Sequence, residues 1–144
     1  MDVIDGSGSI VPEPNWGLLL TDELEVESAR EYWRLVTTEM RERNILSPIN
    51  RHSIQRLIMA YVMFDRTSRT VAEQGPVLKP KRGNPKSIAR MNPHYTAMRE
   101  AGADADRIEA ELGLSPRRRN AAGKIEKKAK VSRASDAYLK PVSK

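Results

Sequence analysis

Apolar residues recur along the front half of the chain at the alternating spacings of three and four that place them on one face of a helix. In the first such series the positions are Val26, Ala29, Trp33, Val36 and Met40. Asp22 and Glu25 precede most of the series in the D-x-x-E pattern of a capping box, which predicts that a helix begins there. Asn44 can adopt the left-handed conformation that ends a helix, so the predicted helix covers about residues 22–44.

A second and longer helix is predicted over residues 47–74. Ser47 is a suitable N-cap and Pro48 suits the first helical position, while Gly75-Pro76 cannot continue a helix. The apolar residues of this helix are Ile54, Leu57, Ile58, Tyr61, Val62 and Phe64. They spread beyond one stripe, which indicates that the helix is buried against several neighbours. The short link before Ser47 predicts that the two helices form an antiparallel helical hairpin.

The segment after Gly75-Pro76 has a different character. Val77-Leu78 and Ser87-Ile88 flank the sequence K-P-K-R-G-N-P, whose Gly83-Asn84 pair suits a tight reversal. A short extended or β-hairpin loop with a basic tip is one interpretation. An irregular connection is equally open, because two proline residues remove donors from a strand ladder.

A third helix is predicted from Asn92-Pro93 to Gly113, with apolar positions at Met98, Ala101, Ala105, Ile108 and Leu112. Ser115-Pro116 predicts a fourth, thinly apolar helix that frays into a disordered tail. Near the other end, Trp16 and the leucines after it could dock on the body or on a neighbouring subunit, but a partly ordered lead-in is favoured. We therefore expect a mainly α protein with a flexible N-terminal arm (1–20), a helical core and oligomerisation domain (21–114) that includes a basic loop (77–91), and a basic C-terminal helix with a disordered tail (115–144).

Charge is segregated along the chain. Residues 1–50 hold 4 Arg against 10 Asp and Glu, a net charge of −6, and residues 51–144 hold 21 Lys and Arg against 9 Asp and Glu, a net charge of +12. Such a distribution favours either pairing between unlike ends of different copies or a polyanionic partner for the basic part. Nucleic acid is the leading candidate for that polyanion.

The basic residues fall in two groups, one in the loop and one after Pro116. Aromatic residues are nearly absent beside them, which favours contact with a duplex backbone over stacking on single-stranded bases. A basic tail can also act as a solubility device or pair with acidic neighbours. The residues predicted to contact DNA phosphates are Lys79, Lys81, Arg82, Lys86, Arg90, Arg117, Arg118, Arg119, Lys124, Lys127 and Lys128.

Catalytic chemistry finds little support in the sequence. Cysteine is absent, no G-x-x-x-x-G-K-[ST] phosphate loop occurs, and neither His52 nor His94 has a second His or Cys at ligand spacing. Each histidine is interpreted as a surface or capping residue, so we expect a non-enzymatic protein without a cofactor or metal. Since no apolar run is long enough to span a bilayer, we expect a soluble, intracellular protein with no membrane partner.

The broad apolar surface of the second helix also predicts self-association. In so short an ordered region it would leave patches that small monomers rarely expose. A heterologous contact between copies commonly closes into a ring. The residues expected to support assembly lie on the first two predicted helices: Trp33, Val36, Met40, Ile54, Leu57, Ile58 and Tyr61.

Several short motifs follow one another in an order that is typical of a known family. Ala29, Tyr32 and Trp33 form an A-x-x-Y-W pattern, the turn of residues 44–46 comes next, and Ala60-Tyr61 leads to Gly75. Asn92-Pro93 opens the third helix, and L-G-L-S-P at residues 112–116 is followed by Arg119. Over about residues 21–125 the chain resembles the small subunit of tailed-phage terminases, in the branch found with cohesive-end siphophages.

The resemblance implies a ring-forming, non-enzymatic protein of the host cytoplasm. Its partners would be viral double-stranded DNA near the packaging start, further copies of itself, and the large terminase subunit, whose ATPase and nuclease it recruits or regulates. The loop is richer in Pro and Lys than the family pattern, and no helix-turn-helix spacing indicates sequence-specific reading of bases. The alternatives are a helical nucleic-acid-binding regulator without a packaging role and a DNA-independent adaptor ring.

Overall fold

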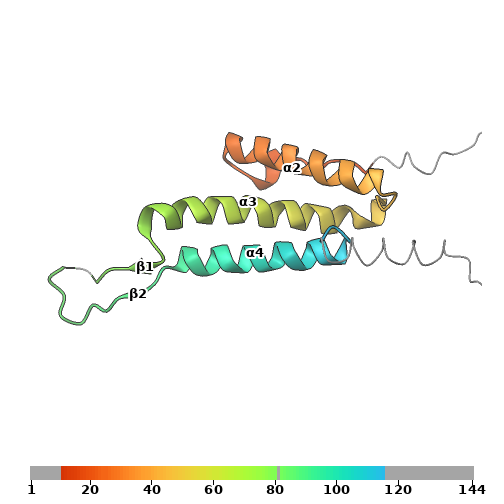
Figure 1. The fold of residues 1–144 in the computed structure, drawn as a ribbon. Helices are drawn as coiled ribbons and strands as arrows, with labels where there is room; N and C mark the ends of the chain where they lie inside the picture. Colours follow the sequence, from red (N-terminus) through yellow and green to blue (C-terminus); the bar gives the residue numbers. More distant parts are fainter. Residues whose placement is uncertain (1–10, 81, 116–144) are drawn as a thin grey trace, which may run out of the picture.

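The computed structural model describes residues 11–80 and 82–115 as a bundle of helices with one short β-ribbon. The three long helices lie side by side with α3 between α2 and α4, and the ribbon projects from the end where α3 stops and α4 starts (Figure 1). The predicted mainly α fold with an antiparallel helical hairpin and a long central helix is thereby confirmed. In chain order the elements are α1 (Trp16–Leu19), α2 (Glu23–Glu42), the 3₁₀ turn η2 (Pro48–Asn50), α3 (Arg51–Gln74), β1 (Val77–Leu78), β2 (Arg90–Met91) and α4 (Pro93–Glu111).

The start of α2 is capped as predicted, but one residue of the predicted capping box acts elsewhere. The Asp22 carboxylate accepts a hydrogen bond from the backbone N–H of Leu24 (2.9 Å), so the helix begins at Glu23. Glu25 does not fold back onto the cap; its buried side chain pairs with Arg66 of α3. The capping-box role of Glu25 was wrong because a two-pronged ion pair with a guanidinium is stronger than one bond to a backbone N–H.

The start of α3 lies at Arg51, later than predicted. Ser47 has extended backbone angles, but its side chain caps nothing, and Pro48–Asn50 form a 3₁₀ turn that leads into the α-helix. The preceding link follows the prediction, since Asn44 has a φ of 56°. Gly75, with a φ of 82°, ends α3 as predicted.

The expectation of a flexible arm is wrong for residues 11–20, which pack on the bundle. The Trp16 side chain is 1% exposed, and its ring meets that of Trp33 edge to face with centroids 6.0 Å apart. Val11 and Leu20 are also buried, and the Nε of Arg51 in α3 donates to the carbonyl of Pro12 (3.0 Å). Burial of the Trp16 indole together with Val11 and Leu20 favours the packed state of this segment and opposes the conformational entropy that its ordering costs.

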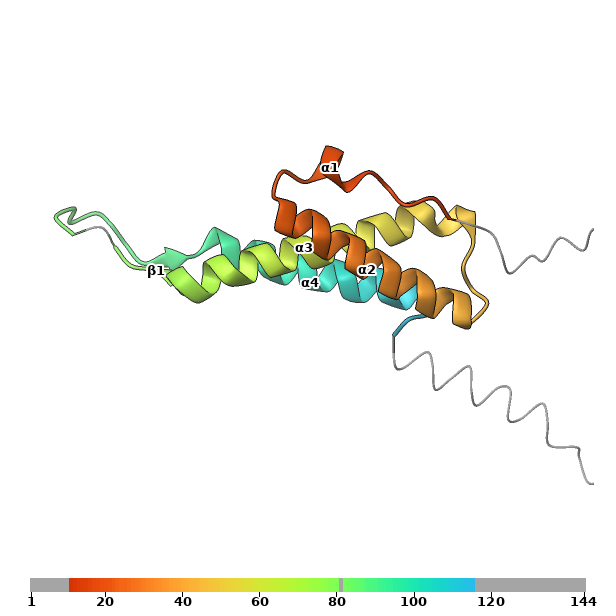
Figure 2. The same ribbon diagram turned by 90° about the horizontal axis from the view of Figure 1, so that it is seen from above.

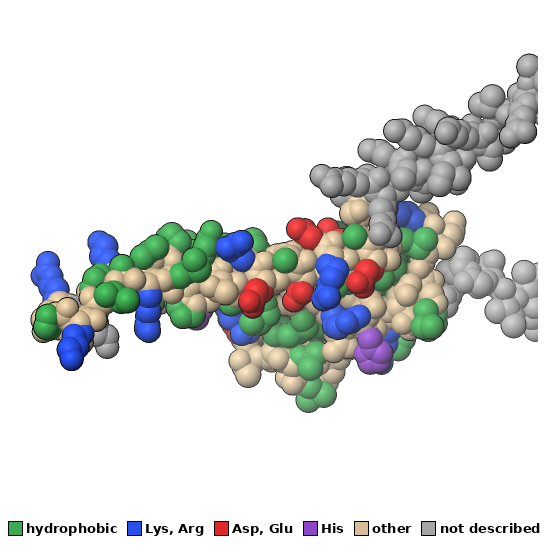
Figure 3. All heavy atoms as spheres, turned by 90° about the horizontal axis from the view of Figure 1, so that it is seen from below, with side chains coloured by type: hydrophobic (Ala, Val, Ile, Leu, Met, Phe, Trp, Pro, Cys, Tyr) green, Lys and Arg blue, Asp and Glu red, His purple; other side chains and the backbone are tan. Residues whose placement is uncertain are grey.

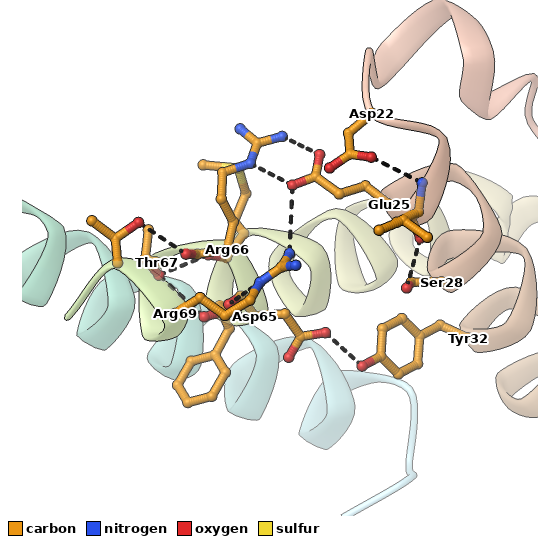
Figure 4. A network of polar contacts seen from close by, with 12 residues as sticks. Asp22, Glu25, Ser28, Tyr32, Asp65, Arg66, Thr67 and Arg69 are labelled. Atoms are coloured by element: carbon orange, nitrogen blue, oxygen red, sulfur yellow. Dashed lines mark hydrogen bonds and ion pairs between the residues drawn. The ribbon is translucent and has the colours of Figure 1, made fainter. Parts of the chain in front are cut away.

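A polar clasp joins α2 to α3 (Figure 4). The Nε of Arg66 donates to Oε1 of Glu25 (2.7 Å), its Nη2 donates to Oε2 (2.5 Å), and Arg69 lies 3.9 Å from Oε1. Hydrogen bonding from Arg66 lowers the pKa of Glu25 below its usual value of 4.5, against the opposing effect of burial. The carboxylate is therefore ionised at neutral pH, and the clasp is formed.

Two tyrosine hydroxyls extend these links across all three helices. Tyr32 of α2 donates to Oδ2 of Asp65 in α3 (2.6 Å), and Tyr61 of α3 donates to Oε1 of Glu109 in α4. The bond to Asp65, with burial, raises the pKa of Tyr32 to about 12, and burial with the bond to Glu109 raises that of Tyr61. Both hydroxyls therefore remain protonated donors in the physiological range.

Asn92 is fully buried at the base of the β-ribbon, where it connects α3 to α4. Its Nδ2 donates to the carbonyl of Gly75 (2.9 Å) and to Oε1 of Gln74 (3.3 Å), both at the end of α3. Its Oδ1 accepts from the backbone N–H of His94 (3.0 Å), and its own N–H donates to the carbonyl of Pro76 (2.9 Å). The predicted cap of the third helix is thus also the link that closes the ribbon.

Replacing Asn92 by Ala is expected to lower the free energy of unfolding by about 2–3 kcal/mol, because a helix cap is lost and the partly buried carbonyl of Gly75 loses its partner. Urea unfolding followed by circular dichroism measures this loss. Asn50→Ala is the control, since its amide makes one exposed contact of 3.4 Å, and a change of under about 0.5 kcal/mol is expected. Equal losses in the two variants would contradict the role given to Asn92.

Replacing Glu25 by Gln is expected to cost about 1–3 kcal/mol at neutral pH, since the charge-assisted pair is weakened. Because the folded-state pKa of Glu25 lies below the unfolded value of 4.5, this contribution is present above that pH and is lost as the pH falls toward the folded-state pKa. Wild type and variant should therefore converge in acid. Urea midpoints across a pH series test this, with the exposed Glu27→Gln on the same helix as control; a gap that stays constant in acid would contradict it.

Candidate nucleic-acid interface

The two β-strands and the chain between them form a projecting segment, which we call the arm (residues 77–91). Val77 pairs with Met91 and Leu78 with Arg90 in antiparallel register, so the β-hairpin interpretation of this segment is confirmed, although the second strand is Arg90–Met91 and not Ser87-Ile88. The described ladder has only these two pairs, because Pro80 and Pro85 lack the N–H that a longer ladder needs. The arm extends beyond the ends of the helices (Figure 2).

The turn at the tip of the arm is held by Asn84. Its Oδ1 accepts a hydrogen bond from the backbone N–H of Lys86 (3.1 Å), and its backbone carbonyl accepts from the N–H of Ser87 (3.0 Å). Gly83, beside it, has a φ of 88°, which a residue with a side chain rarely adopts. The predicted reversal at Gly83-Asn84 is therefore present, and it fixes Pro85 in the middle of the turn.

Positive charge on the arm is exposed and unpaired. Lys79, Arg82, Lys86 and Arg90 are all exposed, and none of them forms an ion pair with another residue in the described ranges. On the face drawn in Figure 3 the arm carries Lys and Arg side chains, whereas Asp and Glu side chains lie over the helical body. The arm can therefore contact a polyanion without first breaking internal ion pairs.

Arg99 extends the positive surface onto α4 and was not among the predicted contacts. Its guanidinium lies 6.0 Å from the centroid of the Tyr95 ring, in the first turns of the helix that leaves the arm. The N-terminal end of α4 adds the partial positive charge of its backbone N–H groups. The signal in the sequence was the absence of acidic residues between Glu73 and Glu100, a stretch that includes Arg99.

A groove of about 540 Å³ follows the arm between its two sides. Leu78 and Ile88 give it apolar walls, and the positive side chains of Lys79 and Arg90 stand beside them. The cations can contact phosphates, and the apolar surface can contact sugars or base edges. This combination therefore suits a nucleic acid better than a small anion.

The second group of predicted DNA contacts lies outside the described residues. This group is Arg117, Arg118, Arg119, Lys124, Lys127 and Lys128. Lys81, a member of the first group, also lies outside the described residues. The structure thus brings together Lys79, Arg82, Lys86 and Arg90 on one projecting element, and the role of each as a phosphate contact stays a prediction.

The residues predicted to support assembly mostly lie in the core of a single chain. Trp33, Met40, Ile54, Leu57 and Ile58 are buried, and Val36 and Tyr61 are partly buried against them. The sequence showed that these side chains need covering but could not show that the same chain covers them. Assembly stays a prediction, and the apolar groups available for it in the described residues are different ones.

No side-chain cluster with catalytic geometry is evident in the described part of the chain. His52 and His94 are exposed at the starts of α3 and α4, as predicted. Within the described ranges, no group of three or more His, Cys, Asp or Glu side chains could hold a metal ion. None of the described helices is both long and apolar enough to cross a membrane.

The fold and the arm define a small helical-bundle protein that presents unpaired positive charge on a β-hairpin. The sequence model of the phage terminase small subunit matches residues 29–129 of the chain. The protein therefore belongs to the phage terminase small subunit family, which places its role in phage DNA packaging. No curated protein and no solved structure matches the chain. The cohesive-end siphophage branch stays a prediction.

Proposed function

We propose that the protein is a non-enzymatic small terminase subunit that binds viral double-stranded DNA and recruits or regulates the large terminase subunit in the host cytoplasm. Family membership supports the packaging role. The observation that carries DNA binding is the set of four exposed, unpaired cations on the arm: Lys79, Arg82, Lys86 and Arg90.

Binding in this proposal is driven mainly by charge. Each phosphate that a Lys or Arg side chain neutralises releases condensed counterions, and the resulting affinity falls steeply as salt is added. The arm supplies one group of contacts, and the basic segment from Arg117 to Lys128 supplies a second. Because phosphate contacts carry no sequence information, these two groups would give affinity and position rather than choice of sequence.

We further propose that copies of the chain form a closed ring through the exposed face of α2. Leu24 and Leu35 are 64% and 57% exposed and lie three helical turns apart on the same face. Ser28, between them on that face, lines a hollow of about 420 Å³ between α2 and α3, together with Phe64. An apolar side chain from a neighbouring copy could fill this hollow, and the neighbour would cover the two leucines.

Replacing Arg82, Lys86 and Arg90 by Gln should weaken binding to duplex DNA and lower the slope of log affinity against log salt by up to about 2.7, at about 0.9 for each lost phosphate contact. Fluorescence anisotropy at several salt concentrations measures both quantities. The matched control replaces three exposed arginines of α2, Arg30, Arg34 and Arg41, by Gln and removes the same charge from the body. Equal effects of the two triple variants would place binding elsewhere than the arm.

The same titration separates the proposal from its alternatives. A protein without DNA affinity even at low salt would be an adaptor ring. DNA binding without co-purification of the large subunit from infected cells would indicate a regulator without a packaging role. The triple variant Arg117→Gln, Arg118→Gln, Arg119→Gln measures the contribution of the C-terminal segment in the same units.

The native mass of the full chain should be a multiple of the 16.2 kDa monomer mass. Replacing Leu24 and Leu35 by Ser should shift it toward the monomer, because the apolar contact between copies is lost. The control replaces Leu18 and Ile49, which are at least as exposed, by Ser and should leave the mass unchanged. Light scattering coupled to size exclusion gives the result; a wild-type monomer would exclude the ring.

A further inference from the structure

The outer part of the arm, between the ladder and the turn, exposes apolar surface as well as charge. Ile88 is 79% exposed, and Pro85 is exposed in the turn between Asn84 and Lys86. These groups stand on a thin projecting element, far from the core of the bundle, where exposure to water costs free energy that burial would recover. Polar residues would suit an arm that only contacts phosphates, so the apolar groups indicate a partner with an apolar interior.

The turn presents Pro85 in a fixed orientation. Asn84 holds the residues on the far side of the proline through bonds to Lys86 (3.1 Å) and Ser87 (3.0 Å). The proline ring itself fixes its own φ. On the other side of Asn84 lies Gly83, which has no side chain to widen the tip. A slim, rigid, apolar tip flanked by Arg82 and Lys86 has the shape of a wedge between two phosphate contacts.

We propose that the arm enters the minor groove of duplex DNA and that Pro85 and Ile88 insert between base pairs, so that the protein bends the DNA that it binds. This inference rests on the proposed DNA binding and adds its groove and its consequence. Proteins that enter the minor groove place Lys and Arg along it and insert side chains such as Pro and Ile between base steps, which kinks the duplex by about 20–90°.

The chemistry of the tip favours the minor groove over reading of bases in the major groove. The side chains of Pro85 and Ile88 carry no donor or acceptor that could read a base edge, and the Oδ1 of Asn84 already accepts a bond within the turn, whereas insertion of apolar side chains between base steps is typical of minor-groove binding. The minor groove is narrower and attracts Arg and Lys through its negative potential. Behind the turn, the remaining arm cations, Lys79 and Arg90, would face the phosphates at the groove edges.

Bending can be measured separately from binding. The full chain is titrated onto a duplex of about 30 base pairs that has an A·T-rich centre and carries a donor and an acceptor dye at its ends. The free duplex is a nearly straight rod, because it is much shorter than the persistence length of about 150 base pairs. Wild-type protein should shorten the end-to-end distance. The double variant Pro85→Ala, Ile88→Ser should bind more weakly than wild type, because apolar contacts are lost, but should keep the wild-type dependence on salt, since its phosphate contacts remain. At saturating protein it should leave the duplex nearly straight.

Controls separate the insertion from a general loss of structure. Ile49→Ser removes an apolar side chain that is 86% exposed in η2, at the opposite end of the bundle, and should bend DNA like wild type. Netropsin, which occupies the A·T minor groove, should suppress bending, whereas methyl green, a major-groove ligand, should not. Circular dichroism checks that each variant retains its helices.

The outcomes distinguish this inference from the proposed function. Wild-type binding without bending, or equal bending by the double variant, would overturn the insertion and leave DNA binding intact. Suppression by methyl green instead of netropsin would overturn the choice of groove. Absence of wild-type binding at low salt would overturn the proposed function itself.

Discussion

The arm depends on the buried amide of Asn92. A two-stranded ribbon with two residue pairs is not stable by itself in water, so its direction must be imposed from its base. At that base, the amide of Asn92 binds the last residues of α3 and caps the first turn of α4. Since α3 and α4 pack along their length, the ribbon leaves the bundle in a direction that both helices determine.

Buried polar groups also hold the helices in register. The core is aliphatic with two tryptophans, and contacts between aliphatic side chains are less directional than hydrogen bonds. Glu25 with Arg66 and Tyr32 with Asp65 join α2 to α3, and Tyr61 joins α3 to α4. Such groups would be costly to bury unpaired, so only one alignment of the three helices satisfies them all.

Local features of the sequence predicted the helices well, because caps and turns depend on neighbouring residues. Asp22, Gly75 and Asn92 act where their chemistry places them. Apart from the start of α3, where the side chain of Ser47 caps nothing, the errors concern contacts between residues far apart in the chain. Glu25 pairs with Arg66, 41 residues away, and Trp16, in the N-terminal segment that was expected to be flexible, packs against Trp33 on another helix.

The candidate interface shows the same division. A stretch without acidic residues identified the positive arm, because charge can be counted from the sequence alone. Ile54 and Leu57 were assigned to assembly because hydrophobicity predicts that a side chain is buried. It does not predict whether the same chain or another copy buries it. The exposed position of Ile88 could not be read from the sequence, since an isoleucine beside a predicted strand usually faces a core.

The positive charges in the body and in the arm serve different purposes. In the body, Arg66 is paired with Glu25 and contributes to stability. In the arm, four unpaired cations repel one another, but two charges about 10 Å apart in water cost only about 0.4 kcal/mol before screening. The four cations of the arm can therefore stay unpaired with little loss of folding free energy. In the proposed DNA complex, a load on the arm would reach α3 through the backbone of Gly75-Pro76 and α4 through Asn92, and the bond from the amide of Asn92 to the carbonyl of Gly75 would couple the two paths.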